Sequence, residues 1–128
     1  YTEDKYGERK EFYSDGDGEF NKPMVVLIDG SSASAAEIMA GAIKDYGKGE
    51  LVGTTTFGKG IVQAVFVYTD GSGGKVTTSK YFTPNGINIH KVGIEPDIEV
   101  EFDGEKYMED GTDNQYNEAV RVLKEKME

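Results

Sequence analysis

The sequence predicts an α/β domain, and three observations lead to that prediction. A short uninterrupted apolar segment at residues 24–28 is typical of a strand buried on both faces of a sheet. A tight turn and a segment with helical spacing of its apolar residues follow it directly. After residue 60 the pattern changes to β-rich segments separated by glycine-rich turns. We therefore expect a mixed sheet with packed helices.

The first half of the chain has the pattern of a strand–helix–strand unit. Residues 24–28 form the first strand, residues 34–46 the helix, and residues 50–54 the second strand, parallel to the first. The helix is expected to bury one apolar face. The residues on that face are Ile38, Ala42, Ile43 and Tyr46.

The second half is expected to extend the sheet and end in a helix. Residues 61–69 and 75–82 predict a hairpin around a turn at residues 70–74, and residues 98–102 a last short strand. A helix should run over residues 113–127, with Thr112 and Gln115 as its capping box. Its apolar stripe consists of Tyr116, Ala119, Val120, Leu123 and Met127.

Composition excludes several kinds of chemistry. Asp and Glu outnumber Lys and Arg by 24 to 14, and the resulting net charge of −10 repels nucleic acid and anionic membranes. The chain has no cysteine and a single histidine, His90, so we expect neither a metal site nor another cofactor. No apolar segment approaches the roughly 20 residues that a membrane helix needs. The opening residues 1–20 lack an initiator Met and a leader, which suggests a piece of a longer protein.

Ser34 is the candidate nucleophile. A serine between a buried strand and a helix is lifted out of the sheet at the positive end of the helix dipole. Small neighbours would let a peptide carbonyl approach, and the N–H of Ala35 could donate to the oxyanion. The same residues also fit a capping box with Glu37, in which Ser34 would only satisfy the start of the helix. Ser31 and Ser32 compete with Ser34 for either role.

Lys59, between Gly58 and Gly60, is the candidate general base. A lysine can deprotonate a serine only in its neutral form, which requires burial away from water and carboxylates. Gln63 is an even number of residues away, so the two side chains share a face if the strand begins early enough. The alternative is an ordinary surface lysine in a flexible turn.

Residues 53–59 also match the first seven positions of a phosphate-binding P-loop. The eighth position, Gly60, is neither Ser nor Thr, and a β-rich segment follows where a P-loop requires a helix. We therefore give nucleotide binding little weight.

Several blocks of the sequence resemble the carboxyl-terminal processing peptidases, the S41 family of serine peptidases. The blocks are SSASAAEI at residues 31–38, TFGKG at 56–60 with Val62 and Gln63, YFTPNG at 81–86, and GIEPD at 93–97. The order of the blocks, and the separation of Ser34 from Lys59, make the resemblance specific. It implies a crotonase-like or Clp-protease-like α/β core, of which residues 1–128 would be the carboxy-terminal part.

The resemblance also implies roles. Ser34 would be the nucleophile, Lys59 the base, Gln63 the residue that orients the lysine, and Ala35 N–H half of the oxyanion hole. Asp45 matches an acidic position near the family's site and would support it. Substrates would be protein or peptide tails bound in extended form, in the bacterial cell envelope, periplasmic or extracytoplasmic.

The chain shows neither the family's PDZ domain nor the core segment that supplies the second oxyanion donor. We therefore expect residues 1–128 alone to be weakly active or inactive. The full-length protein could be a homo-oligomer. The alternative function is a noncatalytic binding or scaffolding module in which Ser34 is a helix cap.

Overall fold

The computed structural model describes residues 1–16, 18 and 20–127, and within this part the chain forms seven strands and three helices. The strands are β1 (Thr2–Asp4), β2 (Arg9–Lys10), β3 (Val25–Ile28), β4 (Glu50–Gly53), β5 (Ile61–Val67), β6 (Gly73–Tyr81) and β7 (Ile98–Glu99). The helices are α1 (Ala35–Asp45), α2 (Gly104–Asp110) and α3 (Asn114–Glu125).

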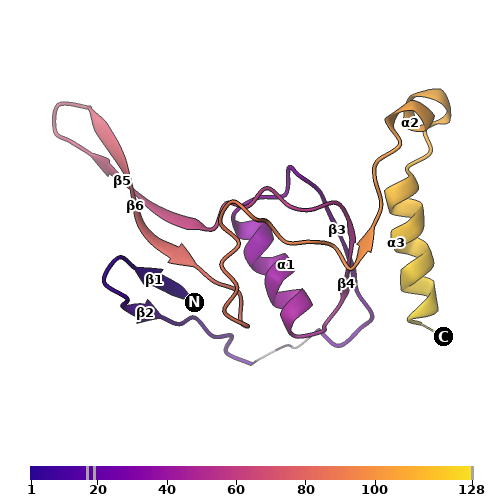
Figure 1. The fold of residues 1–128 in the computed structure, drawn as a ribbon, viewed down its shortest axis with the longest axis horizontal. Helices are drawn as coiled ribbons and strands as arrows, with labels where there is room; N and C mark the ends of the chain where they lie inside the picture. The colour runs from indigo at the N-terminus through magenta and orange to yellow at the C-terminus, as the bar shows by residue number, and fades with distance from the viewer. Residues whose placement is uncertain (17, 19, 128) are drawn as a thin grey trace.

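A three-stranded parallel sheet forms the centre of the fold. Its order is β3-β4-β7, with Leu27 opposite Val52 and Val52 opposite Ile98. Helix α1 packs on β4 from one side, and α3 packs on β3 and β4 from the other (Figure 1). This arrangement confirms the predicted strand–helix–strand unit and the predicted last strand, which is shorter than expected.

The main core lies between α1 and the parallel sheet, closed by the chain that follows β6. Its buried members are Ile28, Ala40, Leu51, Tyr81, Ile89 and Ile94. Val26 and Ile43 pack against this cluster from its edge. The core therefore joins α1, strands β3 and β4 and residues 81–94 into one unit.

A second, four-stranded antiparallel sheet has the order β2-β1-β6-β5. The hairpin of β5 and β6 confirms the prediction, and it projects away from the rest of the chain (Figure 1). Strands β1 and β2 were not predicted, because their residues are polar. Strand β1 forms by pairing with β6, and the Tyr1 ring stacks on Phe82 with 4.9 Å between centroids.

Two expected burial patterns in the first half are wrong. Strand β3 is not buried on both faces, since Leu27 is 44% exposed. In α1, Ile38 and Tyr46 are exposed, and the buried face consists of Glu37, Ala40 and Gly41. Gly41 lies so close to its neighbours that an added Cβ would be 2.9 Å from Thr83 Cγ2. Small residues therefore face the core because the helix packs closely.

The last helix also differs in detail from the prediction. Its N-cap is Asp113, whose side chain accepts the Tyr116 N–H at 2.9 Å, so the box of Thr112 and Gln115 does not form. Gln115 instead donates to Val100 O at 2.7 Å. The buried residues are Ala119 and Val122, while Tyr116 and Met127 are exposed. Helix α2 was not predicted.

Within residues 1–16, 18 and 20–127, the helices are too short or too polar to span a lipid bilayer.

Candidate active site

Ser34 lies where β3 gives way to α1. A tight turn precedes it, held by Asp29, whose Oδ1 accepts the N–H groups of Ser31 and Ser32 at 2.9 and 3.0 Å. Ser34 has φ 58° and ψ −113°, a backbone conformation that residues other than glycine rarely adopt. Such strained positions concentrate at functional sites. The local backbone therefore resembles the sharp strand-to-helix turn that presents a nucleophilic serine.

Lys59 belongs to a loop between β4 and β5 that packs against residues 89–93. Gly58 has φ 86°, and a Cβ added there would be 3.0 Å from backbone nitrogens of that segment. A Cβ added to Gly60 would be 2.7 Å from the backbone nitrogen of His90. Both flanking glycines are thus held in close contact, and Lys59 between them is half-buried. Its backbone is fixed by packing, unlike that of a lysine in an open surface turn.

Glu37, in the first turn of α1, connects the two segments. Its side chain has an exposed fraction of 0%. Its Oε2 accepts the N–H of Ser34 and the N–H of Lys59, each at 2.9 Å. Its Oε1 accepts the Gly58 N–H at 2.7 Å and the Thr56 hydroxyl at 2.5 Å. The amide nitrogens of Ser34 and Lys59 therefore lie no farther apart than twice the length of one hydrogen bond.

Opposing effects set the charge of this carboxyl group. Burial raises the pKa of Glu37, because it disfavours the charged form. The hydrogen bonds donated by Thr56, Lys59, Gly58 and Ser34 stabilise the carboxylate and together hold the pKa below its usual value. A charged carboxylate therefore organises the backbone of the candidate site at neutral pH.

Tyr81, the last residue of β6, connects the same two segments through their carbonyl groups. Its hydroxyl lies 3.1 Å from Ser34 O and is also hydrogen-bonded to Lys59 O. Its own N–H donates to Gly60 O at 3.1 Å. Burial, and secondly the charge of Glu37, raises the pKa of Tyr81 to about 12. The hydroxyl therefore keeps its proton over the physiological pH range.

Most of the chain matches a known family. The model described as peptidase family S41 matches residues 1–100. The chain belongs to this family. The resemblance seen in the sequence is thereby confirmed.

Known S41 relatives are considerably longer than this chain. The carboxyl-terminal-processing protease of Synechocystis sp. is 46% identical over 101 residues, which cover 79% of this chain and 24% of that protein. Carboxy-terminal processing protease CtpB of Bacillus subtilis is 45% identical over 97 residues, or 76% of this chain and 20% of CtpB. The chain thus spans about a quarter or less of these relatives.

Solved structures share the fold. The photosystem II D1 C-terminal processing protease is 47% identical with a TM-score of 0.58, over 62% of this chain and 20% of that one. A lipoprotein from Streptococcus agalactiae reaches a TM-score of 0.70 over 98% of this chain and 43% of its own, at 20% identity, so it shares the fold alone. These likenesses confirm the predicted α/β class.

Ala35 and Gln63, the other residues predicted for the site near Ser34 and Lys59, lie at the start of α1 and in β5. Ala35 is the first residue of α1, so its N–H is among the first-turn groups that lack an acceptor within the helix. Lys59 precedes β5, and the pairing of β5 with β6 shifts register between Val62 and Gln63, where Thr78 is the extra residue on the β6 side. The Gln63 amide donates to Thr77 Oγ1 at 3.4 Å. Its contact with Lys59 stays a prediction.

Asp45 is the last residue of α1, at the opposite end from Ser34. With a rise of about 1.5 Å per residue, the helix places it about 16 Å from Ser34 along the axis. Its Oδ2 accepts the Asn85 N–H at 2.8 Å. Asp45 therefore holds the turn after β6, and its supporting part in the site stays a prediction.

The P-loop alternative does not fit the S41 fold. After Gly60 the chain enters β5, where a phosphate-binding loop would open a helix. The backbone N–H groups of Gly58 and Lys59 already donate to Glu37, so they are not available to a phosphate.

Sequence reasoning assigned no role in the site to Thr56 or Tyr81 and treated Glu37 only as a capping residue. One signal was present for Glu37: it shares the i, i+3, i+4 positions of a helix face with Ala40 and Gly41. These small residues mark a closely packed face, and a carboxylate on such a face needs hydrogen-bond donors from elsewhere in the chain.

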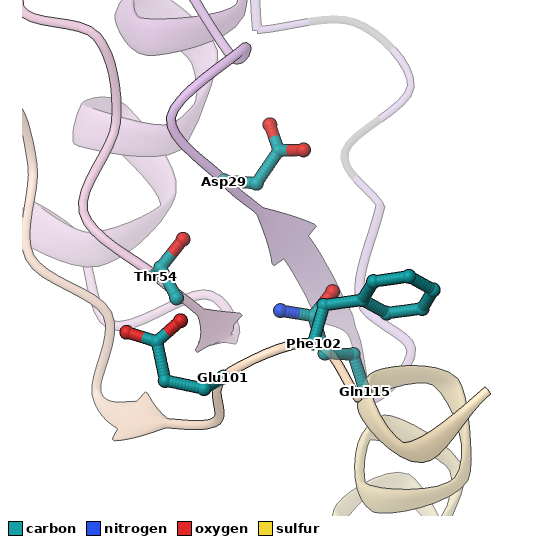
Figure 2. Close-up of a pocket in the computed structure, with 5 residues that line it drawn as sticks. All are labelled: Asp29, Thr54, Glu101, Phe102 and Gln115. Carbon is teal, nitrogen blue, oxygen red and sulfur yellow. The ribbon is translucent and has the colours of Figure 1, made fainter. Parts of the chain in front are cut away.

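A shallow pocket of about 280 Å³ lies at the carboxyl ends of the parallel strands. Figure 2 shows Thr54 and Glu101 on one side of it, Phe102 and Gln115 on the other, and Asp29 at the end of β3. Ser34 and Lys59 do not line this pocket. It borders the candidate active site through Asp29, which holds the turn.

Proposed function

We propose that the protein containing this chain is a serine endopeptidase that cleaves proteins near their carboxyl termini, with Ser34 as nucleophile and Lys59 as general base. The contact that supports this proposal most directly is the sharing of one Glu37 oxygen by the Ser34 and Lys59 N–H groups. A buried carboxylate brings the backbones of two residues 25 positions apart together. A surface lysine and a simple helix cap have no need of that arrangement.

The proposed reaction is acyl transfer to serine followed by hydrolysis. The Ser34 Oγ attacks the substrate carbonyl carbon, and neutral Lys59 takes the hydroxyl proton. The Ala35 N–H stabilises the oxyanion. Lys59 then passes its proton to the leaving amine, and water releases the acyl group. Gln63 would orient the lysine amine.

Several properties of the whole protein belong to the same proposal. The substrates are polypeptide tails bound in extended form, which can add a strand to a sheet edge. The site of action is the bacterial cell envelope, outside the cytoplasm. Named relatives that process carboxyl termini support the substrate class. Residues 1–128 assayed alone should be far less active than the full-length protein, because Ala35 supplies a single oxyanion donor.

A fluorophosphonate probe tests the dyad. The full-length protein should be labelled covalently at Ser34, the Ser34→Ala variant should not be labelled, and the Lys59→Ala variant should react at least 100-fold more slowly. Peptide hydrolysis by the unmodified protein should rise with pH, because a lysine can accept a proton only in its neutral form. Equal labelling of all three proteins would reject the catalytic assignment.

The second candidate is a noncatalytic binding or scaffolding module. The observation in its favour is that Ser34 occupies the N-cap position of α1, with its N–H bonded to Glu37 as in a capping box. In that case Ser34→Ala would lower the free energy of unfolding by about 1 kcal/mol, and no protein would react with the probe.

A further inference from the structure

Tyr81 has no assigned part in the peptidase chemistry, although it contacts both residues of the candidate dyad. We propose that Tyr81 is a positioning residue, whose hydroxyl fixes the spacing between the nucleophile segment and the base segment. This inference rests on the proposed function of Ser34 and Lys59. It concerns the carbonyl groups of these residues, whereas Glu37 holds their N–H groups.

The geometry makes one hydroxyl the common partner of two carbonyl oxygens. Ser34 O is 3.1 Å from the Tyr81 hydroxyl oxygen, and Lys59 O is hydrogen-bonded to the same atom. A phenolic hydroxyl has a single proton to donate. Both carbonyls must therefore approach the same donor, and their mutual repulsion is relieved only while that proton lies between them.

The ring that carries this hydroxyl is itself fixed. Tyr81 is 5% exposed, belongs to the main core cluster and pairs with Thr2 in the four-stranded sheet. Its N–H is bonded to Gly60, next to Lys59. Ser34 follows β3 and Lys59 follows β4 of the parallel sheet. The Tyr81 hydroxyl therefore connects both segments to a fixed position at the end of β6 in the antiparallel sheet.

The Tyr81 hydroxyl can still donate a hydrogen bond at the pH at which the proposed reaction is fastest. Burial and the nearby charge of Glu37 keep Tyr81 protonated to alkaline pH, where the neutral form of a lysine becomes more abundant. Loss of the hydroxyl would leave two carbonyls facing each other without a donor, and the segments that carry nucleophile and base would separate. Displacements of about 1 Å in such sites can lower rates about 100-fold.

The first test is Tyr81→Phe in the full-length protein, which keeps the ring and removes the hydroxyl. We expect kcat for a peptide substrate to fall about 30-fold while KM changes less than twofold, because substrate contacts are untouched. Fluorophosphonate labelling of Ser34 should slow by a similar factor. Ile89→Val is the matched control, since Ile89 is a buried member of the same core cluster and its side chain has no group that can donate a hydrogen bond to either carbonyl.

The second test keeps both ring and hydroxyl. Replacing Tyr81 with 2,3,5-trifluorotyrosine gives a phenol that ionises at much lower pH. Once ionised, it faces two carbonyl oxygens as an anion and ceases to donate. The variant should match the unmodified protein at neutral pH and lose activity at alkaline pH, so that its pH–rate profile becomes bell-shaped.

The results separate the two proposals. If Ser34→Ala and Lys59→Ala remain active, the proposed function fails whatever Tyr81 does. If those variants are inactive, the positioning role is overturned by a Tyr81→Phe kcat within twofold of the unmodified protein. It is equally overturned if Ile89→Val loses as much kcat, or if the fluorinated protein keeps a rising alkaline profile.

Discussion

Ser34 and Lys59 are connected at both their backbone N–H and their backbone carbonyl groups by the same two side chains, Glu37 and Tyr81. Glu37 Oε2 accepts both N–H groups, and the Tyr81 hydroxyl contacts both carbonyl oxygens. Two residues placed in different loops by a parallel sheet thus share the same two partners. The site depends on these partners as much as on its reactive side chains.

Replacing Glu37 with Gln should disrupt the site strongly. Four groups donate to the Glu37 carboxylate, and glutamine would replace one of its two acceptor oxygens with an NH₂ group. Buried N–H groups would then lack an acceptor. We expect a loss of about 3 kcal/mol in the free energy of unfolding, measured by urea denaturation, and at least 100-fold slower probe labelling. Glu109→Gln, on an exposed part of α2, is the control and should change neither quantity.

The same carboxylate should make stability depend on acid pH. The pKa of Glu37 is lowered in the folded state, so between that value and the ordinary 4.5 the unfolded chain binds more protons. The stabilisation is therefore complete above the unfolded value and is lost as pH falls through the folded one. We would measure the free energy of unfolding by urea denaturation at a series of pH values below 5. It should fall less steeply with decreasing pH for Glu37→Gln than for the unmodified protein. Parallel curves for the two proteins would contradict this account.

Gly60→Ala tests whether the lysine loop needs its close packing. The added methyl would lie 2.7 Å from the His90 nitrogen, so the loop must move. Such overpacking should cost about 2 kcal/mol of stability and reduce activity at least tenfold. Gly74→Ala is the matched control, because nothing lies within 4 Å of its added Cβ, and its stability should change by less than about 0.5 kcal/mol.

Asp45→Ala should separate structural from catalytic importance. The change removes the acceptor for the Asn85 N–H at the far end of α1, so a loss of about 1 kcal/mol in stability is expected. Activity measured well below the melting temperature should change less than threefold. A loss of activity as large as that of Lys59→Ala would instead show that Asp45 is needed for the reaction.

The elements with strong local signals were predictable from the sequence. The strand–helix–strand unit was predictable because the apolar segment at residues 24–28, the turn and the helix follow one another without interruption. The hairpin was predictable because β-rich segments flank a glycine-rich turn. The candidate nucleophile and base were identified from their blocks and spacing, and the contact of their side chains stays a prediction.

The parts that were missed depend on partners distant in sequence. Strand β1 is polar and becomes a strand only by pairing with β6, about 77 positions later at Glu3 and Lys80. Glu37 was interpreted only as a capping residue, because the groups that donate to its buried carboxylate come largely from residues 56–59, about 20 positions later. The helix faces were misjudged because alanine and glycine, not the large apolar residues, allow α1 to pack closely on the core.

The order of the site's parts along the chain has a consequence for biosynthesis. Ser34, Glu37 and Lys59 leave the ribosome first, but Tyr81 and the Ile94 N–H that donates to Thr56 come later. A nascent chain that ends before residue 94 therefore carries the proposed nucleophile and base without the contacts from Tyr81 and Ile94. If Ser34 and Lys59 have the proposed roles, a nascent chain should lack peptidase activity until the last of these contacts forms.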